Sequence, residues 1–131
     1  MILVTAGVLR QGGRVLICQR RAGSRHPLQW EFPGGKVEPG ESAEACLARE
    51  LREELGIQAV VGPKLCCVEH RYPAGPEVRL LFFRVLAYSG EPRNLAFEQI
   101  AWVEPADLVP GDFLEADRLF VRGLKRGEIQ P

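Results

Sequence analysis

Short apolar runs separated by glycine-containing turns dominate the first third of the chain. Residues 3–10 and 14–21 form two such runs on either side of a turn at residues 11–13, which predicts a β-hairpin. Residues 30–32 form a third, shorter run that leads into a pair of glycines at residues 34–35. The chain is therefore expected to begin with β-structure that ends at a glycine loop.

The spacing of the apolar residues becomes helical after this loop. Leu47, Leu51 and Leu55 recur at every fourth position, so on a helix they form one stripe that must pack on a core. Ser42 stands where a side chain can cap the first turn, and Gly56 stands where a left-handed residue can end the last turn. These signals predict an amphipathic helix from Ser42 to Leu55.

The second half of the chain returns to β-patterns and closes with a helical one. Residues 59–61 begin a β segment, which Gly62 and Pro63 are expected to interrupt. Strands are also expected at residues 65–71, 78–88 and 100–103, and a final helix at residues 115–125, which carry Leu119, Val121 and Leu124. Helices on both sides of a mixed sheet satisfy this order, so the predicted fold class is α/β.

Length and composition indicate one domain. With 131 residues and 46% hydrophobic content, residues 1–131 are expected to form a single core. The 17 basic and 17 acidic residues cancel, which argues against binding to a nucleic-acid duplex or to an anionic membrane. No apolar run is long enough for a membrane span, and residues 1–4 lack the features of a signal peptide. We therefore expect a cytoplasmic protein, either a monomer or a homodimer.

The cysteines give no sign of a metal or redox site. Cys18, Cys46, Cys66 and Cys67 lack the CxxC spacing, and the neighbouring pair is poorly placed for a bridge. Because each lies in an apolar stretch or on the predicted helix, all four are expected to be buried free thiols.

The predicted helix carries a crowd of negative charge. At about 100° per residue, Glu50, Glu53 and Glu54 share one arc at the edge of the leucine stripe. Glu50 and Glu54 stand one turn apart, where like charges destabilise a helix by about 0.2–0.5 kcal/mol per pair. A divalent cation removes that repulsion, and carboxylates without a nearby histidine or thiol favour Mg²⁺ or Mn²⁺ over zinc. The alternative is a solvated helix face, with Arg49 and Glu53 as an ordinary ion pair.

The loop before the helix favours a ligand site over a solvated face. Gly34 and Gly35 allow the backbone to approach a ligand or a metal closely, because they carry no Cβ atom. Pro39 and Gly40 then form a turn that leads directly into the helix. The sequence therefore combines a close backbone approach with a cluster of carboxylates.

This arrangement resembles the signature of the Nudix hydrolases. Gly35 is followed after five residues by Glu41, and after seven more by Arg49-Glu50-Leu51-x-Glu53-Glu54-x-Gly56-Ile57, which matches that signature at each defined position. Residues 30–32 and Trp102 are similar to the MutT-like branch, which includes 8-oxo-dGTP diphosphatases and CTP pyrophosphohydrolases. The resemblance covers nearly the whole chain. It implies a Nudix α/β/α sandwich with a mixed β-sheet between helices.

The resemblance also implies a reaction and the roles of several residues. It implies hydrolysis of nucleoside triphosphates to monophosphates and pyrophosphate with Mg²⁺, for which Mn²⁺ can substitute. Arg49 is expected to hold a carboxylate in place, and Glu41 resembles the supporting acid at the start of the helix. The expected metal ligands are the carboxylates of Glu50, Glu53 and Glu54, with a backbone carbonyl near Gly34 as the further oxygen that the family implies.

Two residues are equal candidates for the general base. The family commonly recruits a glutamate six residues before the late tryptophan, but that position is Ala96 here. Glu98 stands four residues before Trp102 and is one candidate, with a surface charge as its alternative role. Glu53 on the helix is the other candidate.

Residues outside the signature are expected to select the substrate. Arg21 is similar to a basic residue that contacts the nucleotide in MutT-like relatives, with an exposed strand arginine as the alternative, and Lys36 is placed to steady phosphate. Phe32 offers a stacking surface, although aromatic residues in strands more often pack in a core. Asp117 stands where 8-oxo-dGTP-hydrolysing relatives carry asparagine and CTP pyrophosphohydrolase-like relatives carry aspartate. Its alternative role is to cap the last helix.

Two other functions remain consistent with the sequence. The same helix can act on another nucleoside diphosphate linked to a group X, such as a nucleotide sugar or a dinucleoside polyphosphate. A Nudix-fold ligand sensor without turnover is the second alternative, but such modules typically lose the acids that this chain keeps. In each case the expected partner is a small-molecule nucleotide.

Overall fold

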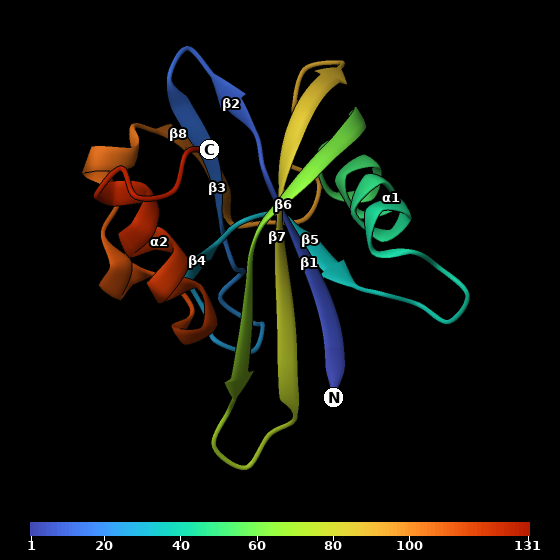
Figure 1. The fold of residues 1–131 in the computed structure, drawn as a ribbon, viewed down its shortest axis with the longest axis vertical. Coiled ribbons are helices and arrows are strands. Elements are labelled where there is room, and N and C mark those ends of the chain that lie inside the picture. The colour runs from blue at the N-terminus through green and yellow to red at the C-terminus, as the bar shows by residue number, and fades with distance from the viewer.

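The computed structural model describes residues 1–131 and contains two β-sheets and two α-helices. The first sheet holds four strands, in the order β5 (Gly34–Lys36), β1 (Ile2–Val8), β7 (Glu77–Ser89) and β6 (Gln58–Arg71). β1 and β7 are parallel, whereas the other neighbours are antiparallel, so the sheet is mixed. Helix α1 (Ala43–Leu55) lies on one side of it and α2 (Arg118–Lys125) on the other (Figure 1). The predicted sandwich with a mixed sheet between helices is confirmed.

The second sheet is smaller and is built around β3 (Arg14–Gln19). Its other strands are β2 (Arg10–Gln11), β4 (Trp30–Glu31) and β8 (Gln99–Val103). Three 3-10 helices, η1 (Pro105–Asp107), η2 (Pro110–Asp112) and η3 (Glu115–Asp117), connect β8 to α2. Neither α-helix has the length and apolar content that a membrane span requires.

Each helix buries its own apolar cluster against the sheets. Leu47, Leu51 and Leu55 of α1 are fully buried, as predicted, and belong to a cluster that includes Phe83 of β7. The preceding residue of β7, Phe82, points to the other side and stacks on Phe120 of α2 with ring centroids 3.9 Å apart. Alternate residues of one strand thus support both layers, because successive side chains of a strand point to opposite faces.

The ends of α1 are fixed by the predicted caps and by a later loop. The Ser42 hydroxyl accepts a hydrogen bond from the Ala45 backbone N–H at 3.0 Å, and Gly56 adopts a left-handed φ of 69°. The backbone N–H groups of Arg93 and Leu95 donate to the carbonyl oxygens of Leu55 and Glu54, at 2.9 and 3.1 Å. The C-terminal turn of α1 therefore has partners for carbonyls that a free helix end leaves unsatisfied.

The predicted interruption at Gly62 and Pro63 is wrong. β6 runs without a break from Gln58 to Arg71, and the pairing with β7 shifts register between Val60 and Cys66. β6 lies at the edge of the sheet, where a bulge can accommodate a proline that lacks an N–H group.

Two further expectations need correction. The final helix begins at Arg118, because residues 115–117 form a 3-10 turn before it. Leu119 is 66% exposed, and the neighbouring Phe120 occupies the buried position instead. Cys67 is also exposed, because it lies on the edge strand β6, and Cys66 is only half-buried.

The glycine pair brings β5 into direct contact with both β1 and α1. A Cβ atom on Gly34 would collide with the carbonyl oxygen of Thr5, and the φ of 156° at Gly34 is one that other residues rarely adopt. A Cβ atom on Gly35 would lie 2.5 Å from the carboxyl carbon of Glu50. Gly34 therefore requires glycine, whereas a Cβ atom at Gly35 would displace the carboxyl group of Glu50.

We predict that Gly34→Ala destabilises the fold. The backbone strain and the collision with Thr5 should together lower the free energy of unfolding by about 2–5 kcal/mol. Urea denaturation measures this change. Gly23→Ala is the matched control, because a Cβ atom there meets nothing within 4 Å, and it should stay within about 0.5 kcal/mol of the wild type. Equal stability of the two variants would contradict this account of the glycine pair.

Candidate active site

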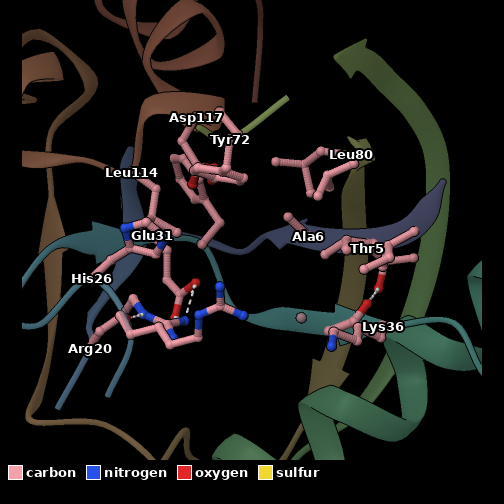
Figure 2. A pocket seen from close by; sticks show the side chains of 18 of the residues that line it. Thr5, Ala6, Arg20, His26, Glu31, Lys36, Tyr72, Leu80, Leu114 and Asp117 are labelled. Carbon is pink, nitrogen blue, oxygen red and sulfur yellow. Dashed lines mark hydrogen bonds and ion pairs between the residues drawn. The ribbon is translucent and has the colours of Figure 1, made fainter. Parts of the chain in front are cut away.

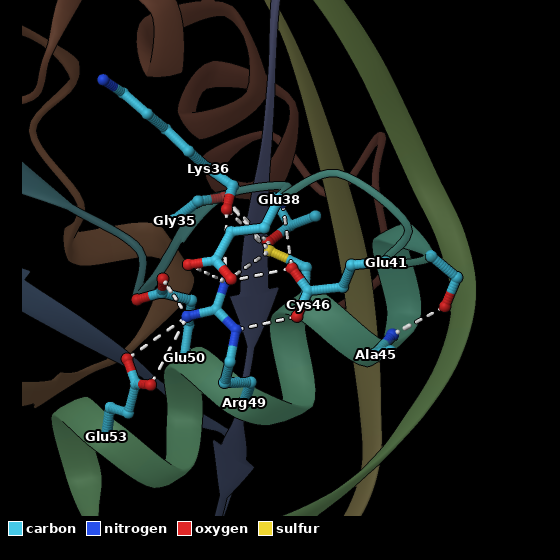
Figure 3. Close-up of polar contacts among 11 residues, drawn as sticks. Gly35, Lys36, Glu38, Glu41, Ala45, Cys46, Arg49, Glu50 and Glu53 are labelled. Atoms are coloured by element: carbon cyan, nitrogen blue, oxygen red, sulfur yellow. Dashed lines mark hydrogen bonds and ion pairs between the residues drawn. The ribbon is translucent and has the colours of Figure 1, made fainter.

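Arg49 connects an acid that precedes α1 to two acids in the second half of the helix (Figure 3). Its Nε and Nη2 atoms donate to the two carboxylate oxygens of Glu41, at 2.8 and 3.0 Å. Its Nη1 donates to Glu50 Oε1 at 2.9 Å and to Glu53 Oε2 at 3.3 Å. One guanidinium thus orients three carboxylates, which is the supporting role predicted for Arg49.

The pair formed by Arg49 and Glu41 is firmly ionised. Hydrogen bonds from Arg49, followed by one from the backbone N–H of Glu38, lower the pKa of Glu41 from 4.5 to about 2. The bond to Glu41 in turn raises the pKa of Arg49 above its already high usual value, despite partial desolvation. The charge that orients the acids of α1 is therefore present at any physiological pH.

Glu54 and Glu50 lie deeper, against the glycine loop. Glu54 Oε1 accepts a hydrogen bond from the backbone N–H of Gly34 at 3.0 Å. Burial raises the pKa of Glu54 to about 8, and the charges of Glu50 and Glu31 add to this shift. Burial also raises the pKa of Glu50, although the hydrogen bond from Arg49 opposes it. Two desolvated carboxyl groups thus repel each other at the loop.

This donor set fits a hard divalent cation. The groups are carboxylate oxygens beside backbone carbonyls, and a positive charge would relieve the desolvation and repulsion that raise the pKa of Glu54. No three histidine, cysteine or acidic side chains converge into a ready-made metal site. One reason that the acids do not converge is that the side chain of Glu53 is 55% exposed and turns toward Arg49.

A pocket of about 370 Å³ opens beside these acids (Figure 2). Gly35, Lys36 and Glu54 line it at the end near α1. Glu31 and Asp117 line another part of it, as Figure 2 shows for the labelled side chains. A single cavity therefore joins the acidic helix to a second carboxyl cluster.

The second cluster consists of Asp117, Glu31 and Arg20. Burial raises the pKa of Asp117 far above its usual value, and the charge of Glu31 raises it further. Burial also raises the pKa of Glu31, but Arg20, whose Nη1 lies 3.3 Å from Glu31 Oε2, lowers it in part. The backbone of Phe32 and the charge of Arg20 lower the pKa of Asp117 only in part, so burial leaves its carboxyl group strongly perturbed.

Asp117 does not cap α2. It stands at the N-cap position, but its side chain makes no capping hydrogen bond and is 3% exposed. The capping role considered from the sequence is therefore absent, and the buried carboxyl group lies at the pocket instead.

Of the remaining candidate residues, two line the pocket and two lie outside it. Lys36 and Phe32 line it, although Phe32 is 3% exposed and packs on Phe82, Phe113 and Phe120 as a core residue. Arg21 is exposed and outside it, as is Glu98, whose backbone N–H donates to Gln19.

Sequence reasoning did not select Glu31 or Arg20 as site residues. Glu31 stands between Trp30 and Phe32. An acid between two aromatic residues indicates a buried carboxyl group, and this pattern could have identified it. The sequence pointed to Arg21 in place of its neighbour Arg20. Both residues follow β3, and the loop there has no periodicity that shows which of the two side chains points inward.

Comparisons with known proteins agree with this geometry. The chain matches the NUDIX domain family over residues 1–124. It is 37% identical over 117 residues to a CTP pyrophosphohydrolase of Escherichia coli (strain K12), covering 89% of this chain and 86% of that protein. It is 34% identical over 125 residues to an 8-oxo-dGTP diphosphatase of Haemophilus influenzae, covering 95% and 91%. The crystal structure of a MutT Nudix hydrolase from Burkholderia pseudomallei has a TM-score of 0.82 at 29% identity, covering 92% and 95%. The chain therefore belongs to the Nudix hydrolase family, in its MutT-like branch.

Proposed function

We propose that this chain hydrolyses nucleoside triphosphates to nucleoside monophosphate and pyrophosphate, with cytosine nucleotides as the preferred substrates. The observation that carries this proposal is the continuous pocket, which Glu54 of the acidic helix lines at one end and the buried carboxyl groups of Asp117 and Glu31 line in another part. A nucleotide offers the matching groups, which are a charged polyphosphate and a hydrogen-bonding base. The whole of residues 1–131 acts as one domain on a small cytoplasmic substrate.

The acidic end suits attack of water on a phosphoanhydride. The oxygen of water forms a bond to phosphorus, the bridging P–O bond between the α- and β-phosphates breaks, and a base takes the water proton. Nudix hydrolases generally need a divalent metal. When bound, Mg²⁺ or Mn²⁺ would neutralise phosphate charge and lower the pKa of water. Glu50, Glu53 and Glu54, with a carbonyl of the glycine loop, would hold it.

Both base candidates are exposed and neither lines the pocket, so the contact with Arg49 is what favours Glu53. Arg49 connects its carboxylate to Glu50, so it belongs to the ordered group on α1. Glu98 is exposed, and its side chain makes no hydrogen bond or ion pair in the structure. Lys36, at the pocket end of β5, is placed to contact phosphate.

The carboxyl pair suits a cytosine edge. A protonated Asp117 both donates and accepts, whereas an ionised carboxylate only accepts. Cytosine presents an amine, N4, next to an unprotonated ring nitrogen, N3, so one acid group can satisfy both. Guanine presents two adjacent N–H donors and would require an ionised acceptor. Adenine presents the same pattern with N6 and N1, and the relative named CTP pyrophosphohydrolase favours cytosine between the two.

A substrate panel tests the proposed reaction directly. Pyrophosphate release with Mg²⁺ should be fastest for cytidine and deoxycytidine triphosphates and slower for 8-oxo-dGTP, nucleotide sugars and dinucleoside polyphosphates. Faster turnover of 8-oxo-dGTP would assign the site to oxidised purines, for which the relative named 8-oxo-dGTP diphosphatase is the precedent. Activity confined to nucleotide sugars or dinucleoside polyphosphates would reject triphosphates as the substrates.

We predict that Glu53→Gln lowers kcat by about 10²–10⁴-fold, because the substitution removes a general base but keeps its shape. Steady-state pyrophosphate release measures this loss, and circular dichroism confirms the fold. Glu98→Gln is the comparison variant and should change kcat by less than about tenfold. A larger loss in Glu98→Gln than in Glu53→Gln would transfer the role of general base to Glu98.

We also predict that Glu54 makes the cation-free fold less stable at higher pH. Between its usual pKa of 4.5 and the folded value of about 8, the folded protein holds a proton that the unfolded chain has released. Stability therefore falls as the pH rises through this window. Glu54→Gln should remove that loss and raise the free energy of unfolding at pH 8, without metal, by on the order of 2 kcal/mol.

Thermal unfolding from pH 5 to 8, in EDTA and in MgCl₂, checks this. The wild type should approach the Tm of Glu54→Gln in EDTA as the pH falls to 5. MgCl₂ should raise the Tm of the wild type more than that of the variant. Parallel curves for the two proteins in EDTA would contradict the raised pKa.

The assignment of the proton to Asp117 predicts that an amide can replace it. Asp117→Asn keeps one donor and one acceptor, so kcat/KM for CTP should fall by less than about tenfold, whereas Asp117→Leu loses both and should fall by about 10²-fold or more. Measurement of kcat/KM for CTP and UTP gives the selectivity. If Asp117→Asn is as impaired as Asp117→Leu, Asp117 acts as a carboxylate.

A further inference from the structure

Two buried polar side chains, Thr5 and Cys46, lie directly behind the glycine loop. Thr5 belongs to β1 and is 1% exposed, and Cys46 belongs to the first turns of α1 and is fully buried. Thr5 Oγ1 and Cys46 Sγ are 3.5 Å apart. The pair therefore connects the sheet to the helix that carries the acids, underneath β5.

Both side chains contact backbone carbonyls of β5. Thr5 Oγ1 donates a hydrogen bond to the carbonyl oxygen of Gly35 at 3.2 Å. Cys46 Sγ lies 3.6 Å from the same oxygen and 3.3 Å from the carbonyl oxygen of Lys36, which also accepts from Arg49 Nη2 at 3.3 Å. The two carbonyls that follow Gly34 thus have donors from β1 and α1.

Gly35 pairs with Thr5 across the ladder between β1 and β5, so the Thr5 hydroxyl adds a side-chain donor on the side where the Gly35 carbonyl faces β1. Glycine has no side chain to restrict rotation of its peptide, and β5 has only three residues. The Cα atom of Gly35 lies against the carboxylate of Glu50, so rotation of this peptide would change the groups that face Glu50. A valine at position 5 would serve strand packing equally well, whereas a threonine in a core requires a partner for its hydroxyl group.

We propose that Thr5, supported by Cys46, is a positioning residue that holds the Gly35 carbonyl in the orientation in which the loop and α1 bind the cation. This inference rests on the cation site of the proposed function. Thr5 also lines the pocket, next to Gly35 and Lys36 and apart from Asp117. Loss of its hydroxyl group with the branched shape kept should therefore weaken cation binding and leave binding of the nucleoside unchanged.

Binding of Mn²⁺ alone separates an effect on the cation site from an effect on the rest of the pocket. Electron paramagnetic resonance counts free Mn²⁺ and gives its Kd for the full chain without substrate or turnover. Thr5→Val, which removes the hydroxyl group and keeps the branched shape, should raise this Kd about threefold to tenfold. Thr5→Ser is the matched control, because it keeps the donor, and its Kd should stay within about twofold of the wild type. Cys46→Ala, which removes a weaker donor, should give a smaller increase than Thr5→Val.

Binding of cytidine monophosphate in EDTA, measured by calorimetry, reports the rest of the pocket. It should be unchanged in Thr5→Val. An unchanged Mn²⁺ Kd in Thr5→Val, or a failure of Thr5→Ser to restore it, would overturn the proposal. A parallel loss of Mn²⁺ and cytidine monophosphate binding would also overturn it, because it would show a general collapse of the loop.

The same experiment distinguishes failure of this inference from failure of the proposed reaction. If the variants differ in Mn²⁺ binding as expected while the wild type hydrolyses no triphosphate, the positioning role stands and the proposed substrate fails. If the wild type turns over CTP and all variants bind Mn²⁺ equally, the reaction stands and the positioning role fails. Absence of Mn²⁺ binding in the wild type would overturn the positioning role together with the cation site.

Discussion

The close contact between β5 and α1 is the constraint on which the rest of the site depends. Because Gly34 and Gly35 carry no Cβ atoms, the carboxyl groups of Glu50 and Glu54 can lie directly against the backbone of the loop. That contact removes the acids from water, which raises the pKa of Glu54 and creates the demand for a positive charge. A Cβ atom at Gly35 would displace the carboxyl group of Glu50 from the loop, and one at Gly34 would collide with the backbone of Thr5.

The same contact lowers the stability of the cation-free fold, although the proposed function requires it. The apolar stripe of α1 holds the helix on the sheet, and the Arg49 network compensates the outer acids, but Glu54 has only the N–H of Gly34 as a direct donor. A fold optimised for stability would replace one of the two inner acids with a neutral residue. The cost of burying these acids is relieved when a cation binds, since the ion favours the ionised form of Glu54 that burial disfavours in the cation-free protein.

The sequence predicted the parts of the structure that local physics determines. The leucine spacing, the serine cap and Gly56 all concern one helix, and the structure confirms each of them. The continuous β6 was missed because Gly62 and Pro63 break a strand in isolation, whereas pairing with β7 carries the chain across a bulge. Glu31 and Arg20 were missed for a related reason: the pairing of β4 with β3 and the ion pair between the two residues bury them, and no local pattern encodes either.

The two parts of the pocket belong to different halves of the core. The acids are carried by α1, whose leucines pack in one apolar cluster, whereas Asp117 lies next to Ala116 and Phe120 in the other cluster, on the far side of the mixed sheet. Substitutions around Asp117 can therefore alter the hydrogen-bonding pattern offered to a base while the leucine cluster under α1 is kept, because the two clusters share no buried residue. Under the proposed function, this separation gives a physical reason why one acidic helix can serve enzymes of different base preference, with Glu31, whose charge acts on both Glu54 and Asp117, as the link between the two parts.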